Sequence, residues 1–131
     1  MTEISGRALV LNEGLSLWGG MDPATGELID SHHPQRGARL AGRVVVMPSG
    51  RGSSSSASIL AEAVRAGTAP AAIVLDEPDL ILAIGSAVAE ELYGVMVPVL
   101  VVGPAVRATI VDGAEVRIGP DGRLQVNFRT A

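Results

Sequence analysis

The sequence predicts a single α/β or mixed β/β/α domain. Three compact apolar segments, 43–47, 71–75 and 97–102, are predicted to be strands, and they alternate with two helix patterns in the middle of the 131-residue chain. Further strand patterns lie towards both ends, and we find no internal repeat and no linker. Strands that alternate with helices are typical of a sheet covered by helices. The length suits one domain with a real core, because such chains bury roughly two thirds of their unfolded surface.

The N-terminal part is predicted to consist of short strands with irregular connections. Ile4–Leu11 and Leu15–Trp18 are predicted to be strands separated by a turn-prone tripeptide, and Glu27–Asp30 is predicted to be another. We expect Gly19–Gly26 to be a loop, because four of its eight residues are Gly or Pro. The polar stretch 31–37 is expected to connect this region to the first core strand.

The middle of the chain carries the clearest helix signals. A helix is predicted from Ala57 to Gly67, because its apolar residues have the spacing of one helix face. Asp79 is a plausible N-cap of a second helix, which reaches position 92 or 93 and stops at Gly94. Each helix follows a predicted core strand, with a loop between the two.

Buried strands and a terminal hairpin complete the predicted sheet. The three core strands are recognised by compact apolar runs rich in β-branched residues, which are typical of strands buried on both faces. Ala114–Ile118 and Arg123–Phe128 are predicted to form a hairpin through the turn Gly119–Gly122. The extra β structure at both ends is the reason for the mixed β/β/α alternative.

The composition excludes several classes of function. The chain has no cysteine, so it cannot by itself hold a disulfide framework, a Cys-ligated zinc or an iron–sulfur cluster. A net charge of −4 and only three aromatic residues argue against nucleic-acid binding. The N-terminus lacks a signal-peptide pattern, and the apolar runs 80–89 and 95–106 are shorter than the ~20 residues that span a bilayer. We therefore expect a cytoplasmic protein that binds neither nucleic acid nor a membrane.

The apolar content is high for so small a chain. Hydrophobic residues make up 47% of the sequence. A surplus of this kind predicts a surface that meets a partner. It should be visible as an exposed hydrophobic face when the chain is seen alone.

A serine-rich loop is the main chemical signal. Six serines lie between positions 49 and 58, together with Gly50 and Gly52, and a predicted helix follows. Glycines let the backbone approach a ligand, the N–H groups at a helix start attract anions, and Arg51 could grip a carboxylate or phosphate. The alternative is a flexible loop whose first serine merely caps the helix. The loop lacks the Gly-Lys-Ser/Thr ending of a Walker motif and the Gly-x-Ser-x-Gly elbow of serine hydrolases.

Other polar residues leave alternatives open. His32 and His33 could supply a base or two metal ligands, but no third ligand lies at a recognisable spacing, so we predict no metal site in this chain. Asp22 could bind substrate or orient His33, or it could simply begin an Asp-Pro turn. Trp18 could contact a substrate or pack in the core. Asp79 could act as an acid, although a helix cap is the simpler account.

Three segments taken together resemble the small subunit, or swivelling domain, of the aconitase X family. The segments are 17–26, 40–54 and 67–74, and the apolar stretch 81–85 is also similar. The resemblance runs from about Gly6 to Val102, so the C-terminal hairpin adds little to it. It implies that residues 1–131 form one swivelling β/β/α domain, with a mixed sheet or barrel-like β core flanked by helices.

The resemblance implies half of an iron-dependent hydro-lyase, a dehydratase of small hydroxy acids. In this family a large subunit carries an iron or iron–sulfur centre on cysteines, and the small one swivels over it with a catalytic serine. Aconitase-type enzymes carry that serine in a Gly-Ser-Ser-Arg loop, which Gly52-Ser53-Ser54 matches, so Ser53 is predicted to be the base. Ser54, Arg51 and Gly52 are predicted to bind substrate. The final arginine of the motif is replaced by Ser55, so its carboxylate-binding role is not carried over to that position.

The family has two substrate classes. Bacterial members dehydrate cis-3-hydroxy-L-proline, and archaeal members dehydrate mevalonate 5-phosphate. The segment 89–94 is more similar to the bacterial type, so we predict the hydroxyproline, with mevalonate 5-phosphate as the alternative. An alternative of another class is a non-catalytic ligand-binding or phosphohistidine-carrier domain, in which His32 or His33 would accept the phosphate. No histidine follows the serine loop as it does in such carriers.

Overall fold

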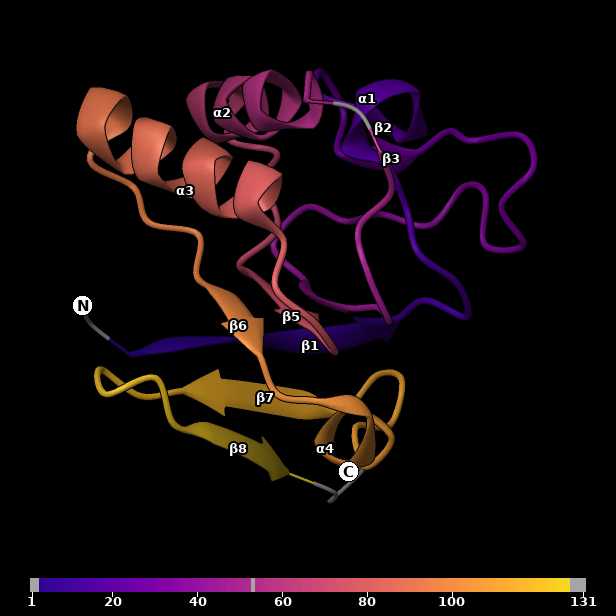
Figure 1. The fold of residues 1–131 in the computed structure, drawn as a ribbon, viewed down its shortest axis with the longest axis vertical. Helices are drawn as coiled ribbons and strands as arrows, with labels where there is room; N and C mark the ends of the chain where they lie inside the picture. Colours follow the sequence, from indigo (N-terminus) through magenta and orange to yellow (C-terminus); the bar gives the residue numbers. More distant parts are fainter. Residues whose placement is uncertain (1–2, 53, 128–131) are drawn as a thin grey trace.

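A mixed sheet with helices packed on it forms the framework of the computed structural model, which describes residues 3–52 and 54–127 (Figure 1). The two longest helices lie side by side over one face of the sheet. Along the chain the elements are β1 (Ile4–Val10), α1 (Leu17–Gly20), β2 (Met21–Asp22), β3 (Glu27–Leu28), β4 (Val44–Val46), α2 (Ser56–Ala66), β5 (Ala72–Leu75), α3 (Leu80–Tyr93), β6 (Val99–Val101), α4 (Pro104–Arg107), β7 (Glu115–Ile118) and β8 (Leu124–Asn127).

The main sheet has six strands in the order β6-β5-β4-β1-β7-β8. Strands β6, β5, β4 and β1 run parallel to one another, with Leu9 opposite Val45, Val45 opposite Ile73 and Ile73 opposite Val99. Strand β7 is antiparallel to β1, and β8 is antiparallel to β7. The predicted core strands and the C-terminal hairpin are therefore confirmed for the described residues, although the β6 strand is shorter than expected.

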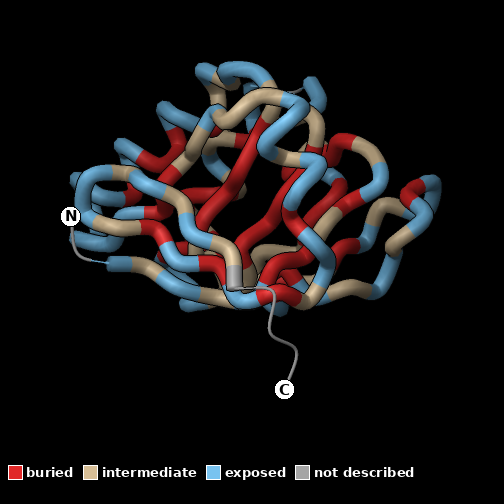
Figure 2. Tube along the Cα trace, turned by 90° about the horizontal axis from the view of Figure 1, so that it is seen from below, coloured by how far each residue is buried: buried red, intermediate tan, exposed pale blue. Residues whose placement is uncertain are grey.

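The central strands are buried on both faces, as their unbroken apolar runs predict. Val45 and Ile73 belong to the hydrophobic cluster under α2 and α3. Val44 and Val74 belong to a second cluster on the other face, which includes residues of β7 and the segment before it. Figure 2 shows these buried strands crossing the middle of the molecule. The sheet is thus a rigid support from which the loops at the strand ends project.

Both predicted helices are confirmed, together with the signals that end them. Asp79 caps α3, because its Oδ1 accepts a hydrogen bond from the Leu82 N–H at 3.0 Å. Gly67 follows α2 with a φ of +77°, and Gly94 follows α3 with a φ of +68°. These are left-handed conformations that glycine adopts at low cost, so each helix ends where its glycine stands.

Helices α2 and α3 approach each other closely at Gly85. A Cβ atom added to Gly85 would lie 2.9 Å from the Ala57 Cα and 3.0 Å from the Ala57 carbonyl oxygen. The atoms that a side chain would meet are backbone, which cannot move aside cheaply. The absence of a side chain at Gly85 therefore sets the spacing of the two helices.

The predicted strand Leu15–Trp18 is wrong. Only Leu15 makes a β-bridge, to Gly50, and the chain then enters the short turn α1. Gly19 has a φ of +77°, which lets the chain reverse. The Trp18 N–H donates to the Ser56 Oγ at 3.2 Å rather than to a neighbouring strand. A side chain distant in sequence thus takes the hydrogen bond that a strand would have used.

The region around residues 21–30 and the segment after β6 also differ from expectation. Of the predicted strand Glu27–Asp30, only the two residues of β3 form a strand. They pair with β2, which lies inside the segment 19–26 that is expected to be a loop.

Helix α4 is not indicated by the sequence. Its Arg107 Nε donates to the Asp76 Oδ1, and this half-buried ion pair holds α4 against the end of β5. Phe128, the predicted end of the hairpin, lies outside the described residues.

The predicted exposed hydrophobic face is confirmed on α3. Leu80 is 74% exposed and Leu92 is 62% exposed, and Ile84 and Val88 between them are also exposed. A spacing of four residues places these side chains along one side of the helix. We refer to these four residues as the α3 stripe. Among the residues that the structure describes, no helix is long and apolar enough to cross a membrane.

We predict that Gly85→Ala destabilises the fold although alanine favours helix. The gain in helix propensity is about 1 kcal/mol, but overpacking against the Ala57 backbone costs about 1–3 kcal/mol. We expect a net loss of about 1 kcal/mol in the free energy of unfolding, measured by urea denaturation. The control is Ala87→Ser, a small change at an exposed position of the same helix. A stability equal to or above that of the wild type would contradict this account of the helix contact.

Candidate active site at the serine loop

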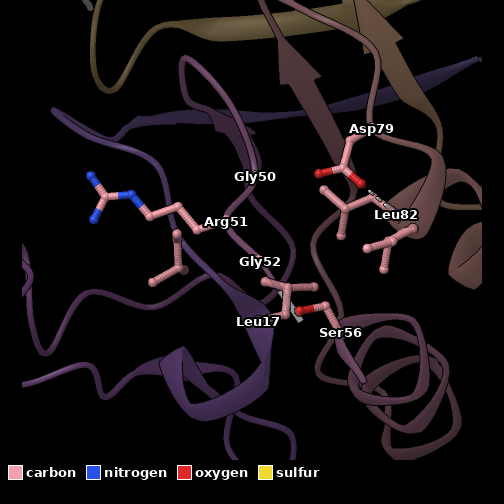
Figure 3. A pocket seen from close by; sticks show the side chains of 9 residues that line it. Leu17, Gly50, Arg51, Gly52, Ser56, Asp79 and Leu82 are labelled. Carbon is pink, nitrogen blue, oxygen red and sulfur yellow. Dashed lines mark hydrogen bonds between the residues drawn. The ribbon is translucent and has the colours of Figure 1, made fainter. Parts of the chain in front are cut away.

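The loop between β4 and α2 lies beside the start of α3, and the two form a small open pocket (Figure 3). The pocket has an empty volume of about 210 Å³, part of which is open solvent. Three segments line it: the chain before α1 with the first residue of α1, the serine loop with the first residue of α2, and the start of α3. Their lining residues are Leu15, Leu17, Gly50, Arg51, Gly52, Ser56, Asp79, Ile81 and Leu82.

The backbone of the serine loop is held against the segment before α1. Leu15 and Gly50 form a parallel β-bridge, and the Arg51 N–H donates to the Leu15 carbonyl oxygen at 3.2 Å. Next to them, a Cβ atom on Gly14 would lie 2.4 Å from the Ser49 carbonyl oxygen. A side chain at Gly14 would therefore push the loop away. The loop keeps its path because glycine allows the two backbones to touch.

Asp79 holds the loop from the opposite side. A Cβ atom on Gly50 would lie 2.2 Å from the Asp79 Oδ2, so the carboxylate packs directly against the Gly50 backbone. Its other oxygen, Oδ1, caps α3 at the Leu82 N–H. Figure 3 shows one oxygen of Asp79 turned towards the loop and the other towards Leu82. The cap prediction for Asp79 is confirmed, and the residue is in addition part of the pocket.

Ser56, the first residue of α2, connects the loop to α1. It is 3% exposed. Its Oγ accepts from the Trp18 N–H at 3.2 Å and lies 3.3 Å from the Ser16 Oγ. Trp18 itself is 57% exposed, so its ring is not core packing. The sequence does not indicate this role of Ser56, because its partners lie 38 and 40 residues away in the chain.

The structure places the predicted substrate-binding residues in different surroundings. Gly52 lines the pocket with a φ of +57°, and Arg51 also lines it. The Arg51 guanidinium, however, points away from Asp79 and lies 3.7 Å from the Glu13 carboxylate (Figure 3). Ser54 is exposed and is not among the pocket residues. Ser53, the predicted base, lies outside the described residues.

The histidine alternative finds little support in the structure. His33 is 4% exposed, its Nε2 lies 3.2 Å from the Glu13 carbonyl oxygen, and its Nδ1 accepts from the Gln35 N–H at 3.1 Å. Both ring nitrogens are thus engaged with backbone, so His33 fastens the 31–37 connection and is not available to accept a phosphate. His32 is exposed on the same connection.

Asp22 begins a turn, as one of the two sequence alternatives proposed. Its Oδ1 accepts from the Ala24 N–H at 2.9 Å, and its carbonyl oxygen accepts from the Gly26 N–H at 2.7 Å. These bonds close the turn between β2 and β3. Within residues 3–52 and 54–127, no group of three or more His, Asp or Glu side chains is arranged to hold a metal ion.

The sheet, the two covering helices and the loop at the start of α2 define a swivel-type α/β domain. The family model of the aconitase X swivel domain matches residues 1–126. The chain therefore belongs to the aconitase X family, as its swivel domain. The resemblance of its three segments to this family is confirmed over most of the chain.

Two curated relatives and one solved structure illustrate the similarity. Over 99 residues, 76% of this chain, it is 52% identical to the cis-3-hydroxy-L-proline dehydratase of Pseudomonas aeruginosa, but it spans only 17% of that relative's length. It is 45% identical over 82 residues to the phosphomevalonate dehydratase small subunit of Methanopyrus kandleri, covering 63% of this chain and 61% of that one.

The similarity in structure extends further along the chain. The crystal structure of Thermococcus kodakaraensis aconitase X in its holo-form superposes with a TM-score of 0.83 at 27% identity. The match covers 95% of this chain and 90% of that chain. The expected fold, a swivelling β/β/α domain with a mixed sheet flanked by helices, is thereby confirmed.

We predict that Ser56→Ala loosens the contact between α2 and α1. The change leaves the Trp18 N–H without its acceptor, which costs about 1–2 kcal/mol of unfolding free energy. Trp18 is the sole tryptophan of the chain, so its fluorescence reports the local change. Ser58→Ala, at an exposed position of the same helix, is the control. Unchanged stability and fluorescence in Ser56→Ala would show that this contact does not hold the turn.

Proposed function

We propose that this chain is the small subunit, or swivel domain, of an aconitase X-type dehydratase that acts on cis-3-hydroxy-L-proline. The observation that carries the proposal is the 52% identity to the Pseudomonas aeruginosa dehydratase of that name. The matched segment covers 76% of this chain, so the similarity includes most of the residues around the serine loop. The activity belongs to the complete enzyme, of which this chain supplies one part.

The second candidate is dehydration of mevalonate 5-phosphate. It is supported by the Methanopyrus kandleri relative, a phosphomevalonate dehydratase small subunit that is 45% identical over 63% of this chain. Sequence identity favours the first candidate, because the cis-3-hydroxy-L-proline dehydratase of Pseudomonas aeruginosa is 52% identical over 76% of this chain.

Both reactions need a base near the substrate. Dehydration removes a proton from the carbon next to a carboxylate and expels the hydroxyl group from the neighbouring carbon. We assign the base to Ser53, on the motif Gly52-Ser53-Ser54. A serine hydroxyl is a poor base unless its alkoxide is stabilised. The start of α2, an 11-residue helix, supplies a positive dipole end next to this motif.

We place the iron centre of the proposed enzyme on a large subunit. The residues of this chain do not fit such a centre: it has no cysteine, and its described residues contain no group of metal-binding side chains. The part played by this chain is to bring the serine loop to the substrate and to exclude water when the two subunits close.

The α3 stripe supports a large-subunit partner. Leu80, its most exposed member, stands between Asp79 and Ile81, which line the pocket. From there the stripe continues along α3, and no charged residue occurs from 80 to 89. A partner that covers the pocket would therefore lie next to Leu80. We therefore propose that the large subunit covers this stripe, since exposed apolar patches of this kind mark interaction surfaces.

We predict that Ser53→Ala abolishes dehydration and leaves assembly intact. The chain alone is expected to be inactive, and addition of the large subunit is expected to restore turnover of cis-3-hydroxy-L-proline. Loss of the proposed base should lower kcat by about 10²–10⁴-fold without changing the elution of the complex in size-exclusion chromatography. Ser58→Ala, on the exposed side of α2, is the matched control. A normal kcat in the Ser53→Ala complex would remove Ser53 from the mechanism.

We predict that Ile84→Asp with Val88→Asp weakens binding of the large subunit. Two charges in the centre of the stripe would be buried without partners, so we expect Kd to rise by about 10²-fold or more, measured by titration calorimetry. Val111→Asp, at an exposed apolar position next to Ile110 of the second hydrophobic cluster, should leave Kd unchanged. If both variants bind as the wild type does, the large subunit covers another face.

A further inference from the structure

The pocket at the serine loop contains a carboxylate where the sequence predicts only an anion site. Asp79 lines the pocket together with Gly50, Gly52 and Ser56. Its Oδ1 is used by the α3 cap, and its Oδ2 packs against Gly50. In the part of the chain that the structure describes, no hydrogen bond reaches Oδ2. One carboxylate oxygen is therefore left to interact with whatever enters the pocket.

The two sides of the pocket differ in charge. On one side stands Ser56, the first residue of α2, whose dipole favours an anionic group, and Gly52 lies four residues before it in the loop. On the other side stands the Asp79 carboxylate, which favours a cation. The Arg51 guanidinium does not neutralise it, because that side chain points away and lies next to Glu13. A ligand that reaches both sides from the open mouth of the pocket would need an anionic and a cationic group, as a zwitterion has.

The two candidate substrates differ in this property. At neutral pH cis-3-hydroxy-L-proline carries a ring ammonium beside its carboxylate, so it is a zwitterion. Mevalonate 5-phosphate carries a carboxylate and a phosphate and has no positively charged group. Asp79 would attract the ring ammonium of the hydroxyproline. It would repel mevalonate 5-phosphate, because that substrate carries only negative groups. Like charges brought together in a site strongly disfavour the wrong ligand.

On the basis of the function proposed above, we propose that Asp79 recognises the substrate ammonium and makes the site selective for a cyclic hydroxy amino acid over a phosphorylated hydroxy acid. A cap alone does not require this charge, because asparagine caps helices as well as aspartate does. The cap also uses only one of the two carboxylate oxygens. Oδ2 takes no part in the cap, so it can bind the substrate ammonium while Oδ1 caps α3.

The variant Asp79→Asn tests this role, because it keeps the cap and the size of the side chain and removes the charge. In the assembled enzyme we expect the KM for cis-3-hydroxy-L-proline to rise about tenfold or more, with a much smaller effect on kcat. The midpoint of urea unfolding should stay unchanged. The control is Glu77→Gln, which removes an exposed charge two residues away and outside the pocket; its KM should equal that of the wild type.

Two unreactive ligands measure the same property without turnover. L-Proline has the ring ammonium, and tetrahydrofuran-2-carboxylate has a ring oxygen in its place. By titration calorimetry, the wild-type complex should bind L-proline more tightly, and Asp79→Asn should lose this preference. A wild-type complex that binds L-proline preferentially without dehydrating the hydroxyproline would refute the proposed function alone. Equal preference in both proteins, or no preference in the wild type, would overturn the role of Asp79.

Discussion

The candidate site depends on two close contacts of the serine loop, one with the backbone at Gly14 and one with the Asp79 carboxylate. A side chain on Gly14 would strike the Ser49 carbonyl oxygen, and one on Gly50 would strike the Asp79 carboxylate. Because neither glycine has a side chain, the serine loop runs in contact with the segment before α1 on one side and with the start of α3 on the other. The same contacts place the start of α2 and the Asp79 carboxylate in one pocket. The chemistry proposed for the loop requires this arrangement.

Elements with local signals were predictable from the sequence. Asp79, Gly67 and Gly94 stand where α2 and α3 begin or end, since capping and left-handed glycine act within a few residues. Strands β4 and β5 are buried on both faces and appear as unbroken apolar runs. The turn at α1 was not predictable, because the acceptor of the Trp18 N–H is Ser56 on a distant helix. Long-range side-chain contacts of this kind leave no periodic pattern in the sequence.

The site was predictable only in part, for the same reason. The sequence indicates that the serine loop precedes a helix and that Asp79 caps another, and both hold for the described residues. It does not indicate that the two meet, because their contact depends on how β4 and β5 pair and on the missing side chain at Gly50. The opposite case is His33, which looks chemically active in the sequence but has both ring nitrogens bound to backbone. Ser53 stays a prediction that rests on the family motif.

The central claim is that this domain completes a dehydratase for a zwitterionic hydroxy acid. It is tested most directly by comparing kcat/KM for cis-3-hydroxy-L-proline and mevalonate 5-phosphate in one preparation of this chain assembled with its large subunit. We expect the hydroxyproline to be preferred by about 10²-fold or more. A preference for mevalonate 5-phosphate, or turnover of neither compound, would contradict it.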